Sequence, residues 1–293
     1  MNSFTEYARP LRTEIDRALD GYMRREETCP ESLREAMRYS LLGPGKRLRP
    51  LLVLMATEAC GGRYQAAMPA ACAVEMVHTY SLVHDDLPAM DDDDMRRGRP
   101  SCHVQFGEAL AILVGDALLT RAFEVLARDI QPPDVAAACC AAMGRAAGPG
   151  ELVGGQVDDI RAESHGGDLA LLESIHRRKT GAMINLSLQL GALVAGAHDE
   201  QLEALGSYGS KLGLAFQIVD DILDLRGNEV LVGKRLRQDS ARGKLTFPAV
   251  LGLEESERRA KVLVSEAEEA LAPFGKRAGG LVSLARYVVR RSR

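Results

Sequence analysis

The segment from His84 to Pro100 limits what this chain can fold into more than any other part of the sequence. It reads H-D-D-L-P-A-M-D-D-D-D-M-R-R-G-R-P, with six aspartates followed by three arginines. The residues before it, Ala70 to Val83, are mostly apolar and predict a buried helix. Carboxylates crowded at the end of such a helix need a counter-charge. Both a solvated acidic loop and a site for Mg²⁺, which prefers oxygen ligands, fit this pattern.

A second carboxylate cluster, Asp220-Asp221-x-x-Asp224, favours the metal site. Asp220 and Asp224 are four residues apart in a helical pattern, so they lie on one helix face. The neighbouring residues are apolar and predict a buried helix, in which acidic side chains rarely lie without partners. Two such helices facing each other could hold several Mg²⁺ ions that are shared with substrate phosphates.

The rest of the chain shows the apolar periodicity of helices. Apolar residues recur at three- and four-residue steps from Phe4 to Tyr22, and no convincing strand alternation appears anywhere. The chain is 46% hydrophobic but only 4% aromatic, which suits helices packed through Ala, Leu, Val and Met. We therefore expect an all-α helical bundle around a central cavity, forming one domain over residues 1–293.

Glycine and proline mark the expected ends of the helices. After the first helix, the expected ranges are 31–42, 50–60, 70–83, 104–129, 134–147, 168–197, 200–225, 247–271 and 278–291. Asp134 is a plausible N-cap. Gly154-Gly155 is interpreted as a break and residues 227–243 as a loop.

Charge and cysteine content exclude several classes of protein. The net charge of −4 gives no general case for nucleic-acid binding. The six cysteines form no C-x-x-C pair, so we expect reduced thiols. The N-terminus lacks an apolar signal region, and the most apolar later stretch, 182–197, is too polar to span a membrane. We expect a cytoplasmic protein with no stable membrane insertion.

The basic residues suit a substrate that carries several phosphates. They lie in or beside the breaks and motifs, at Lys46, Arg47, Arg49, Arg96, Arg97, Lys179, Lys234 and Lys244. No nucleophile–base pattern, Walker loop or G-x-G-x-x-G stands out. Metal ions that bind a diphosphate stabilise its departure as a leaving group. An apolar cavity can then hold the carbocation and keep water away from it.

Taken together, the motifs resemble those of the trans-type polyprenyl diphosphate synthases, most closely the bacterial farnesyl diphosphate synthases. The resemblance covers nearly the whole chain. It rests on G-P-G-K-R-L-R-P from Gly43, the aspartate-rich segment, G-G-Q from Gly154, H-R-R-K-T-G-A from His176 and F-Q-I-V-D-D-I-L-D from Phe216. Pro44 stands where the family usually has glycine. The family implies an all-α bundle, typically a homodimer, whose two aspartate motifs face each other across a deep cavity.

The resemblance also implies roles for individual residues. With substrate bound, three Mg²⁺ ions would be held by Asp85, Asp86, Asp91, Asp220, Asp221 and Asp224. The allylic diphosphate would be bound by Arg96, Lys179, Thr180, Gln217 and Lys234. Isopentenyl diphosphate would be bound by Lys46, Arg49, His78 and Arg97. Without the resemblance, His78, Thr180 and Gln217 are more typical of ordinary packing. The departing diphosphate would take the proton, so no side-chain base is expected.

Tyr80 and Ser81 are the expected determinants of product length. They precede Asp85 by about one helical turn, roughly 6–8 Å. In the family, a large residue here, together with two extra residues before Asp91, goes with a C15 product. We therefore expect (2E,6E)-farnesyl diphosphate, formed by head-to-tail (1'-4) condensation of isopentenyl diphosphate with dimethylallyl and then geranyl diphosphate. Ordinary core packing of Tyr80 is the alternative.

Three other functions fit parts of the sequence. A geranylgeranyl diphosphate synthase needs only a deeper pocket. A terpene cyclase also uses D-D-x-x-D, but commonly pairs it with a different second metal motif. A non-catalytic subunit is disfavoured by the intact acidic and basic motifs.

Overall fold

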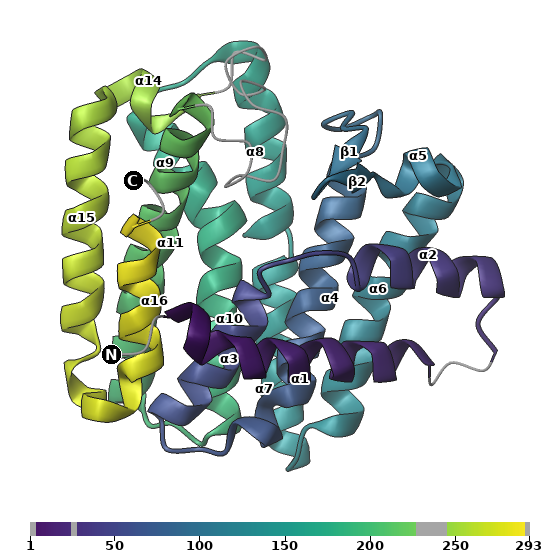
Figure 1. Ribbon diagram of the computed structural model, residues 1–293, viewed down its shortest axis with the longest axis horizontal. Coiled ribbons are helices and arrows are strands. Elements are labelled where there is room, and N and C mark those ends of the chain that lie inside the picture. The colour runs from purple at the N-terminus through teal and green to yellow at the C-terminus, as the bar shows by residue number, and fades with distance from the viewer. Residues whose placement is uncertain (1–3, 25–27, 227–244, 291–293) are drawn as a thin grey trace.

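The computed structural model describes residues 4–24, 28–226 and 245–290, and most of them are helical (Figure 1). Lys234 and Lys244 lie outside these residues, as does the expected loop 227–243. The helices are α1 (Phe4–Arg24), α2 (Glu31–Leu41), α3 (Leu48–Ala59), α4 (Met68–Asp85), α5 (Cys102–Phe106), α6 (Glu108–Asp129), α7 (Pro133–Ala147), α8 (Leu152–His165), α9 (Leu169–His176), α10 (Ala182–Val194), α11 (Asp199–Arg226), α14 (Phe247–Leu251), α15 (Leu253–Ala270) and α16 (Gly279–Arg290).

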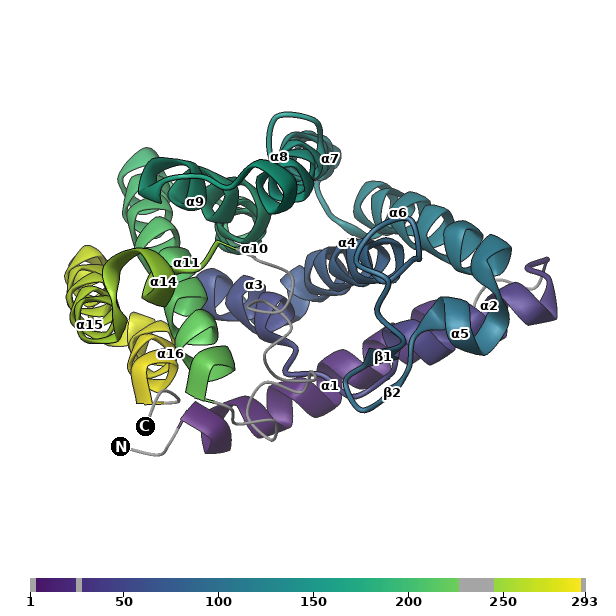
Figure 2. The same ribbon diagram turned by 90° about the horizontal axis from the view of Figure 1, so that it is seen from above.

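Four helices, α3, α4, α10 and α11, form the centre of the bundle (Figure 2). Helix α3 packs on α4 and α10, α10 packs on α11, and α6 and α15 cover α4 and α11 from outside. Helices α3 and α10 are apolar nearly all round, which is why they lie inside. By contrast, α1 buries one face, through Leu11, Ile15 and Leu19, and crosses one side of the bundle. The all-α prediction is confirmed.

Several helix boundaries differ from the sequence prediction. Gly107 and Gly252 have positive φ and split two expected long helices, giving α5–α6 and α14–α15. Gly154 and Gly155, predicted to break a helix, lie inside α8. Helix α7 begins at Pro133, so Asp134 belongs to its first turn and the cap prediction is wrong.

One short hairpin interrupts the helical chain. Strands β1 (Met95–Arg96) and β2 (Arg99–Pro100) pair antiparallel, with Arg96 opposite Arg99. Both residues of the connecting turn have positive φ, 53° at Arg97 and 76° at Gly98, as a type I′ turn requires. The hairpin therefore presents arginines from a tight turn beside the first aspartate motif.

In the described part of the chain, we find no helix with the length and apolar character needed to span a bilayer.

Candidate active site

The first aspartate motif folds back on the end of α4. The amide of Asp91 donates to the carbonyl of Asp85 at 2.8 Å, and the amide of Asp93 donates to the carbonyl of Asp86 at 3.2 Å. These bonds close a wide turn that begins at Leu87 and Pro88. The insertion before Asp91 thus does not extend the helix but returns Asp91 to the end of the helix.

Asp85 and Asp86 have different partners although they are adjacent. Lys179 Nζ lies 3.9 Å from Asp85 Oδ2, on the side of α8 and α10. Asp86 is buried and accepts from Arg96 Nε at 2.9 Å, while Arg96 also reaches Asp93 at 3.3 Å. Asp85 therefore belongs to the face with Lys179, whereas Asp86 is the counter-ion of the hairpin arginine.

The carboxyl of Asp85 lies in an electrostatically unfavourable site although Lys179 is nearby. Burial raises its pKa from 3.8 to about 6, against the lowering effect of Lys179, and the nearby Asp91 carboxylate adds to the rise. The pKa of Asp86 is raised as well, by burial, although its bond with Arg96 opposes the shift. A cation placed beside Asp85 and Asp91 would relieve this strain.

The second aspartate motif lies on α11, where Asp221 and Asp224 are buried and Asp220 is partly exposed. Asp221 Oδ2 accepts from the amide of Phe247 at 2.9 Å, so this carboxylate holds the start of α14. Asp220 is close enough to Arg49 to raise the pKa of that guanidinium in part. The motif thus faces both the basic loop and the last part of the bundle.

Protein side chains alone do not complete a metal site in residues 4–24, 28–226 and 245–290. Among them, no three His, Cys, Asp or Glu side chains converge as a metal cluster does. Mg²⁺ commonly takes only one or two carboxylates and fills its other positions with waters and substrate phosphates. The paired Asp85 and Asp91 fit that mode of binding, in which the diphosphate supplies the missing ligands.

A π-helical turn, Arg177–Gly181, brings the expected allylic-diphosphate residues together. Lys179 Nζ donates to Asp159 Oδ2 at 2.9 Å, and Thr180 Oγ1 donates to Gln217 Oε1 at 3.0 Å. Turns of this kind occur often at functional sites. The contact of Asp159 with Lys179 was not predicted. Asp159 follows the G-G-Q motif by three residues, in Val157-Asp158-Asp159. Its nearness to that motif was the only signal in the sequence that could have pointed to it.

The basic loop between α2 and α3 is built on a buried arginine. Arg47 is 3% exposed and donates to Glu75 at 3.0 Å, to Asp16 at 2.7 Å and to the carbonyl of Gly43 at 3.0 Å. Its φ of 50° turns it inward. Arg47 therefore anchors the loop rather than contacting a ligand.

Arg49, the third basic residue of this motif, lies in the first turn of α3 and is positioned to bind an anion. Its Nε is buried and has no hydrogen-bond acceptor in the described structure. Burial lowers the pKa of the Arg49 guanidinium to about 10. Glu75 and Asp220 oppose this shift, and the positive charge of Arg97 adds to it. An anion at this point would supply the missing acceptor and the missing negative charge.

His78 lies among these arginines. Burial, and then Arg49, Arg97, Arg96 and Arg47, lower the pKa of its imidazole well below 6.5. The ring is thus neutral at pH 7 and can offer one N–H to a ligand, but no charge. Lys46, by contrast, is exposed at the edge of a groove between α1, α3 and α16.

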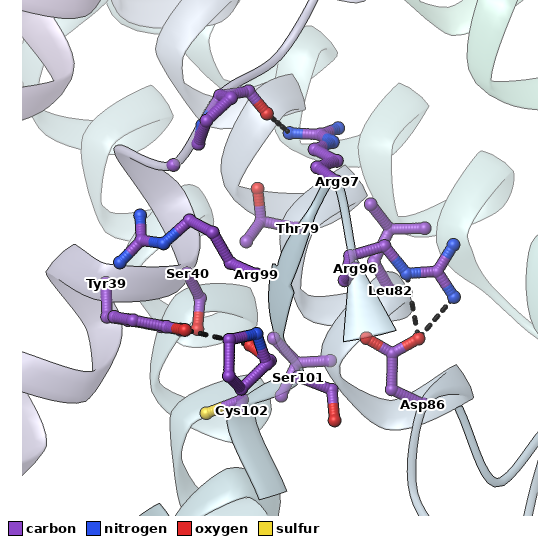
Figure 3. A pocket seen from close by; sticks show the side chains of 14 residues that line it. Tyr39, Ser40, Thr79, Leu82, Asp86, Arg96, Arg97, Arg99, Ser101 and Cys102 are labelled. Atoms are coloured by element: carbon purple, nitrogen blue, oxygen red, sulfur yellow. Dashed lines mark hydrogen bonds and ion pairs between the residues drawn. The ribbon is translucent and has the colours of Figure 1, made fainter. Parts of the chain in front are cut away.

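Behind the hairpin lies a small pocket, shown in Figure 3. Asp86 and Arg96 point toward one another at its edge. Arg97 NH1 donates to the carbonyl of Pro44 at 3.1 Å, so the hairpin contacts the basic loop directly. Three non-glycine residues of the described chain have positive φ. Arg47 lies in the basic loop, Asp92 in the aspartate-rich segment, and Arg97 in the turn of the hairpin. Such backbone strain clusters at binding sites.

Tyr80 lies where a floor of the cavity was expected. It is 8% exposed, and its ring packs edge-on against His84, with centroids 5.6 Å apart and planes at 88°. The Asp85 charge contributes to raising the pKa of its phenol, after burial. His84 is held in turn on α6, where its Nε2 lies 3.0 Å from the carbonyl of Ile112. The neighbouring Ser81 is partly exposed, and its hydroxyl donates to the carbonyl of His78.

Comparison with known proteins gives one family throughout. Residues 30–272 match the sequence model of the polyprenyl synthetase family. A farnesyl diphosphate synthase of Geobacillus stearothermophilus is 43% identical over 92% of this chain and 91% of its own. A geranylgeranyl diphosphate synthase of Cyanophora paradoxa is 42% identical over 90% of this chain and 89% of its own. The crystal structure of an FPP/GFPP synthase from Zymomonas mobilis, 37% identical, superposes with a TM-score of 0.88 over 98% of both chains. Together with its two aspartate motifs and its basic motifs, these matches show that the chain belongs to the polyprenyl synthetase family and is a chain-elongating prenyltransferase.

Proposed function

We propose that this enzyme makes (2E,6E)-farnesyl diphosphate by adding isopentenyl diphosphate to dimethylallyl diphosphate and then to geranyl diphosphate. The observation that carries the C15 product is the position of Tyr80. Its buried ring lies one helical turn before Asp85 and is fixed against His84. A chain growing down the cavity from the aspartates would meet this ring.

The residues divide the work between two diphosphates. Lys179, Thr180 and Gln217 hold the allylic diphosphate together with Arg96. Arg49, Arg97, Lys46 and neutral His78 hold isopentenyl diphosphate. Asp85 and Asp91 face the metal, and Asp220 does so from α11. Asp86 and Asp221 also belong to this set, although Arg96 and the amide of Phe247 already occupy them. Lys234 is the further expected contact, outside the described residues.

Bound Mg²⁺, three ions in our proposal, supplies Lewis acidity that stabilises the leaving diphosphate. The C1–O bond of the allylic substrate breaks, and its C1 bonds to C4 of isopentenyl diphosphate. A proton then leaves C2 of the former isopentenyl unit for the released diphosphate. The protein contributes orientation through its two basic loops and excludes water through the apolar walls of α4 and α6.

Product analysis tests the assignment. The purified enzyme is incubated with labelled isopentenyl diphosphate, dimethylallyl diphosphate and Mg²⁺, and the dephosphorylated alcohols are separated by chromatography. Farnesol is the expected main product, and EDTA should abolish it. Geranylgeraniol as the main product would instead support the second candidate, a geranylgeranyl diphosphate synthase, which the similarity to the Cyanophora paradoxa enzyme favours.

A change at Tyr80 tests the floor itself. Tyr80→Ala removes the ring and should shift the products toward C20. The matched control is Tyr64→Ala, because Tyr64 lies outside the site and contacts Glu14. An unchanged product profile in Tyr80→Ala would remove Tyr80 as the floor.

We also propose that the enzyme is a homodimer. Ile112 and Leu113 on α6 are 45% and 53% exposed. Val153, Val157 and Ile160 are exposed at one-turn spacing on α8, and α6, α7 and α8 lie along one side of the bundle (Figure 2). Neighbouring apolar side chains of this kind mark a surface that a second copy could cover.

A further inference from the structure

The hairpin that carries Arg96 and Arg97 needs an anchor that does not depend on those two arginines. Its strands have two residues each, and a hairpin of that size is not stable by itself. Arg96 is bound to Asp86 and Asp93, and Arg97 to the carbonyl of Pro44. In the proposed function, both guanidinium groups also face diphosphates. A contact that ligand binding would disturb cannot be what fixes the hairpin.

Tyr39, in the last turn of α2, makes the independent contacts. Its hydroxyl donates to the carbonyl of Pro100 at 2.9 Å, at the end of β2. The guanidinium of Arg99 lies over its ring, 3.9 Å from the centroid. The edge of Phe106, on α5, packs against the same ring at 5.2 Å and 81°. Figure 3 shows Tyr39 and Arg99 on the side of the pocket away from Asp86.

The same tyrosine is joined directly to the basic loop. Helix α2 ends at Leu41, and the chain continues through Gly43 to Lys46 and Arg49. Arg99 NH1 lies 3.7 Å from the ideal Cβ position of Gly43, and Arg97 NH1 lies 2.6 Å from that of Gly45. The arginine side chains of the hairpin therefore pack directly against the glycines of the turn Gly43-Pro44-Gly45.

We propose that Tyr39, with Arg99, is a positioning residue that sets the hairpin relative to the basic loop and so fixes Arg97 against Arg49 for binding isopentenyl diphosphate. Arg96 keeps its place through its own carboxylates. Arg97 has φ of 53° and donates to a backbone carbonyl, that of Pro44, rather than to a carboxylate, so its position depends on the anchor. This inference rests on the proposed assignment of Arg97 and Arg49 to the isopentenyl diphosphate site.

Equilibrium binding tests the anchor separately from turnover. The dissociation constants of isopentenyl diphosphate and of dimethylallyl diphosphate with Mg²⁺ are measured by calorimetry for the full-length enzyme. Tyr39→Phe, which loses only the hydroxyl, should weaken isopentenyl diphosphate binding about 3-fold to 5-fold. Tyr39→Leu and Arg99→Met, which also lose the cation–π contact, should weaken it about 10-fold. Arg99→Lys should recover part of the loss.

Binding of dimethylallyl diphosphate should change less than about 2-fold in all four variants, because Arg96 remains paired. Tyr64→Phe removes a tyrosine hydroxyl elsewhere, from its contact with Glu14, and should leave both constants unchanged. Equal losses for both diphosphates, or a lower thermal midpoint with unchanged binding of isopentenyl diphosphate, would show a merely structural role and overturn the inference.

The outcomes separate this inference from the proposed reaction. If the wild type yields farnesol but Tyr39→Leu binds isopentenyl diphosphate normally, the anchor is wrong and the function stands. If the wild type yields no product but the selective loss of binding is seen, the function is wrong and the anchor stands. A wild type that does not bind isopentenyl diphosphate overturns both.

Discussion

A buried carboxylate at the end of α4 costs the folded protein free energy when nothing neutralises it. The pKa of Asp85 is raised from 3.8 to about 6, chiefly by burial. Ionisation is therefore easier in the unfolded chain than in the folded one, and the cost appears as pH rises from about 4 to about 6. In EDTA at pH 7.5, Asp85→Asn should stabilise the protein by about 1–3 kcal/mol while abolishing activity.

The sign of this effect can be checked with pH. At pH 4 the carboxyl is protonated in the folded protein and partly protonated in the unfolded chain, so most of the gain from Asp85→Asn should vanish. Urea unfolding at pH 4 and pH 7.5 measures the change in the free energy of unfolding that Asp85→Asn causes. Asp116→Asn, the same change at an exposed aspartate of α6, should show no comparable gain. A stabilisation of Asp85→Asn that is equal at pH 4 and 7.5 would mean that charge burial is not its cause.

Arg47 gives the opposite prediction, because here a buried charge is paired. Arg47→Met leaves Glu75, which is 1% exposed, without its direct partner. Removing one member of a buried pair should destabilise the protein by about 3 kcal/mol in urea unfolding. The double variant Arg47→Met/Glu75→Met should lose less than the sum of the single variants. Additive losses would exclude coupling between the two side chains.

At the scale of single residues, the sequence predicted the kinds of group but not their partners. The carboxylates and cations of the motifs were identifiable from their spacing. Spacing alone could not separate Arg47 from Lys46 and Arg49, because the inward turn at φ 50° is a tertiary feature, and only the family resemblance left Arg47 out of the binding set. The capture of Asp86 by Arg96 likewise depends on where the hairpin lies. The local sequence pattern therefore predicts neither the inward turn of Arg47 nor the pairing of Asp86 with Arg96.

At the scale of elements, the close approach of α8 to the π-helical turn Arg177–Gly181 fixes Lys179. A Cβ on Gly155 would lie 2.8 Å from the backbone nitrogen of Lys179 and 3.0 Å from Cβ of Arg178. Gly155→Ala should therefore push the turn away from α8, destabilise the protein by about 1–3 kcal/mol and raise KM for the allylic diphosphate about 10-fold. Steady-state kinetics with each substrate varied in turn measures the effect.

The matched control lies on the preceding helix. Gly144, on α7, has nothing within 4 Å of its ideal Cβ position. Gly144→Ala should leave both KM values unchanged and raise stability by up to about 1 kcal/mol, the helix propensity of alanine over glycine. Normal allylic KM in Gly155→Ala would show that the turn does not depend on this contact.

The two different roles of glycine explain why the sequence predicted the main helices correctly but misplaced some of their ends. The helical periodicity located the main helices, since their apolar faces follow the packing. Gly107 and Gly252 end helices because their φ is positive, whereas Gly154 and Gly155 stay helical because α8 needs a surface without side chains there. A glycine in sequence does not distinguish these two uses. The two-residue strands of the hairpin are too short to show an alternation.

At the scale of the whole molecule, the arrangement of helices follows from which ones are apolar all round. Helices α3 and α10 had such sequences and lie at the centre, and Thr57 bonds the carbonyl of Gly191 where they meet. Helix α4 packs on both α3 and α10, and α11 packs on α10, so the two aspartate motifs lie on helices that border the same centre. Amphipathic pattern alone does not say which helix neighbours which, and the family resemblance supplied that information.

The exposed apolar pair on α6 gives the prediction for the assembled molecule. If Ile112 and Leu113 lie between two copies, Ile112→Lys/Leu113→Lys would bury four unpaired cations across a two-fold axis. The variant should then elute as a monomer in size-exclusion chromatography with light scattering, where we expect the wild type to elute as a dimer. Val262→Lys, at an α15 residue that is 43% exposed, should remain dimeric. A fully dimeric double variant would place the interface elsewhere.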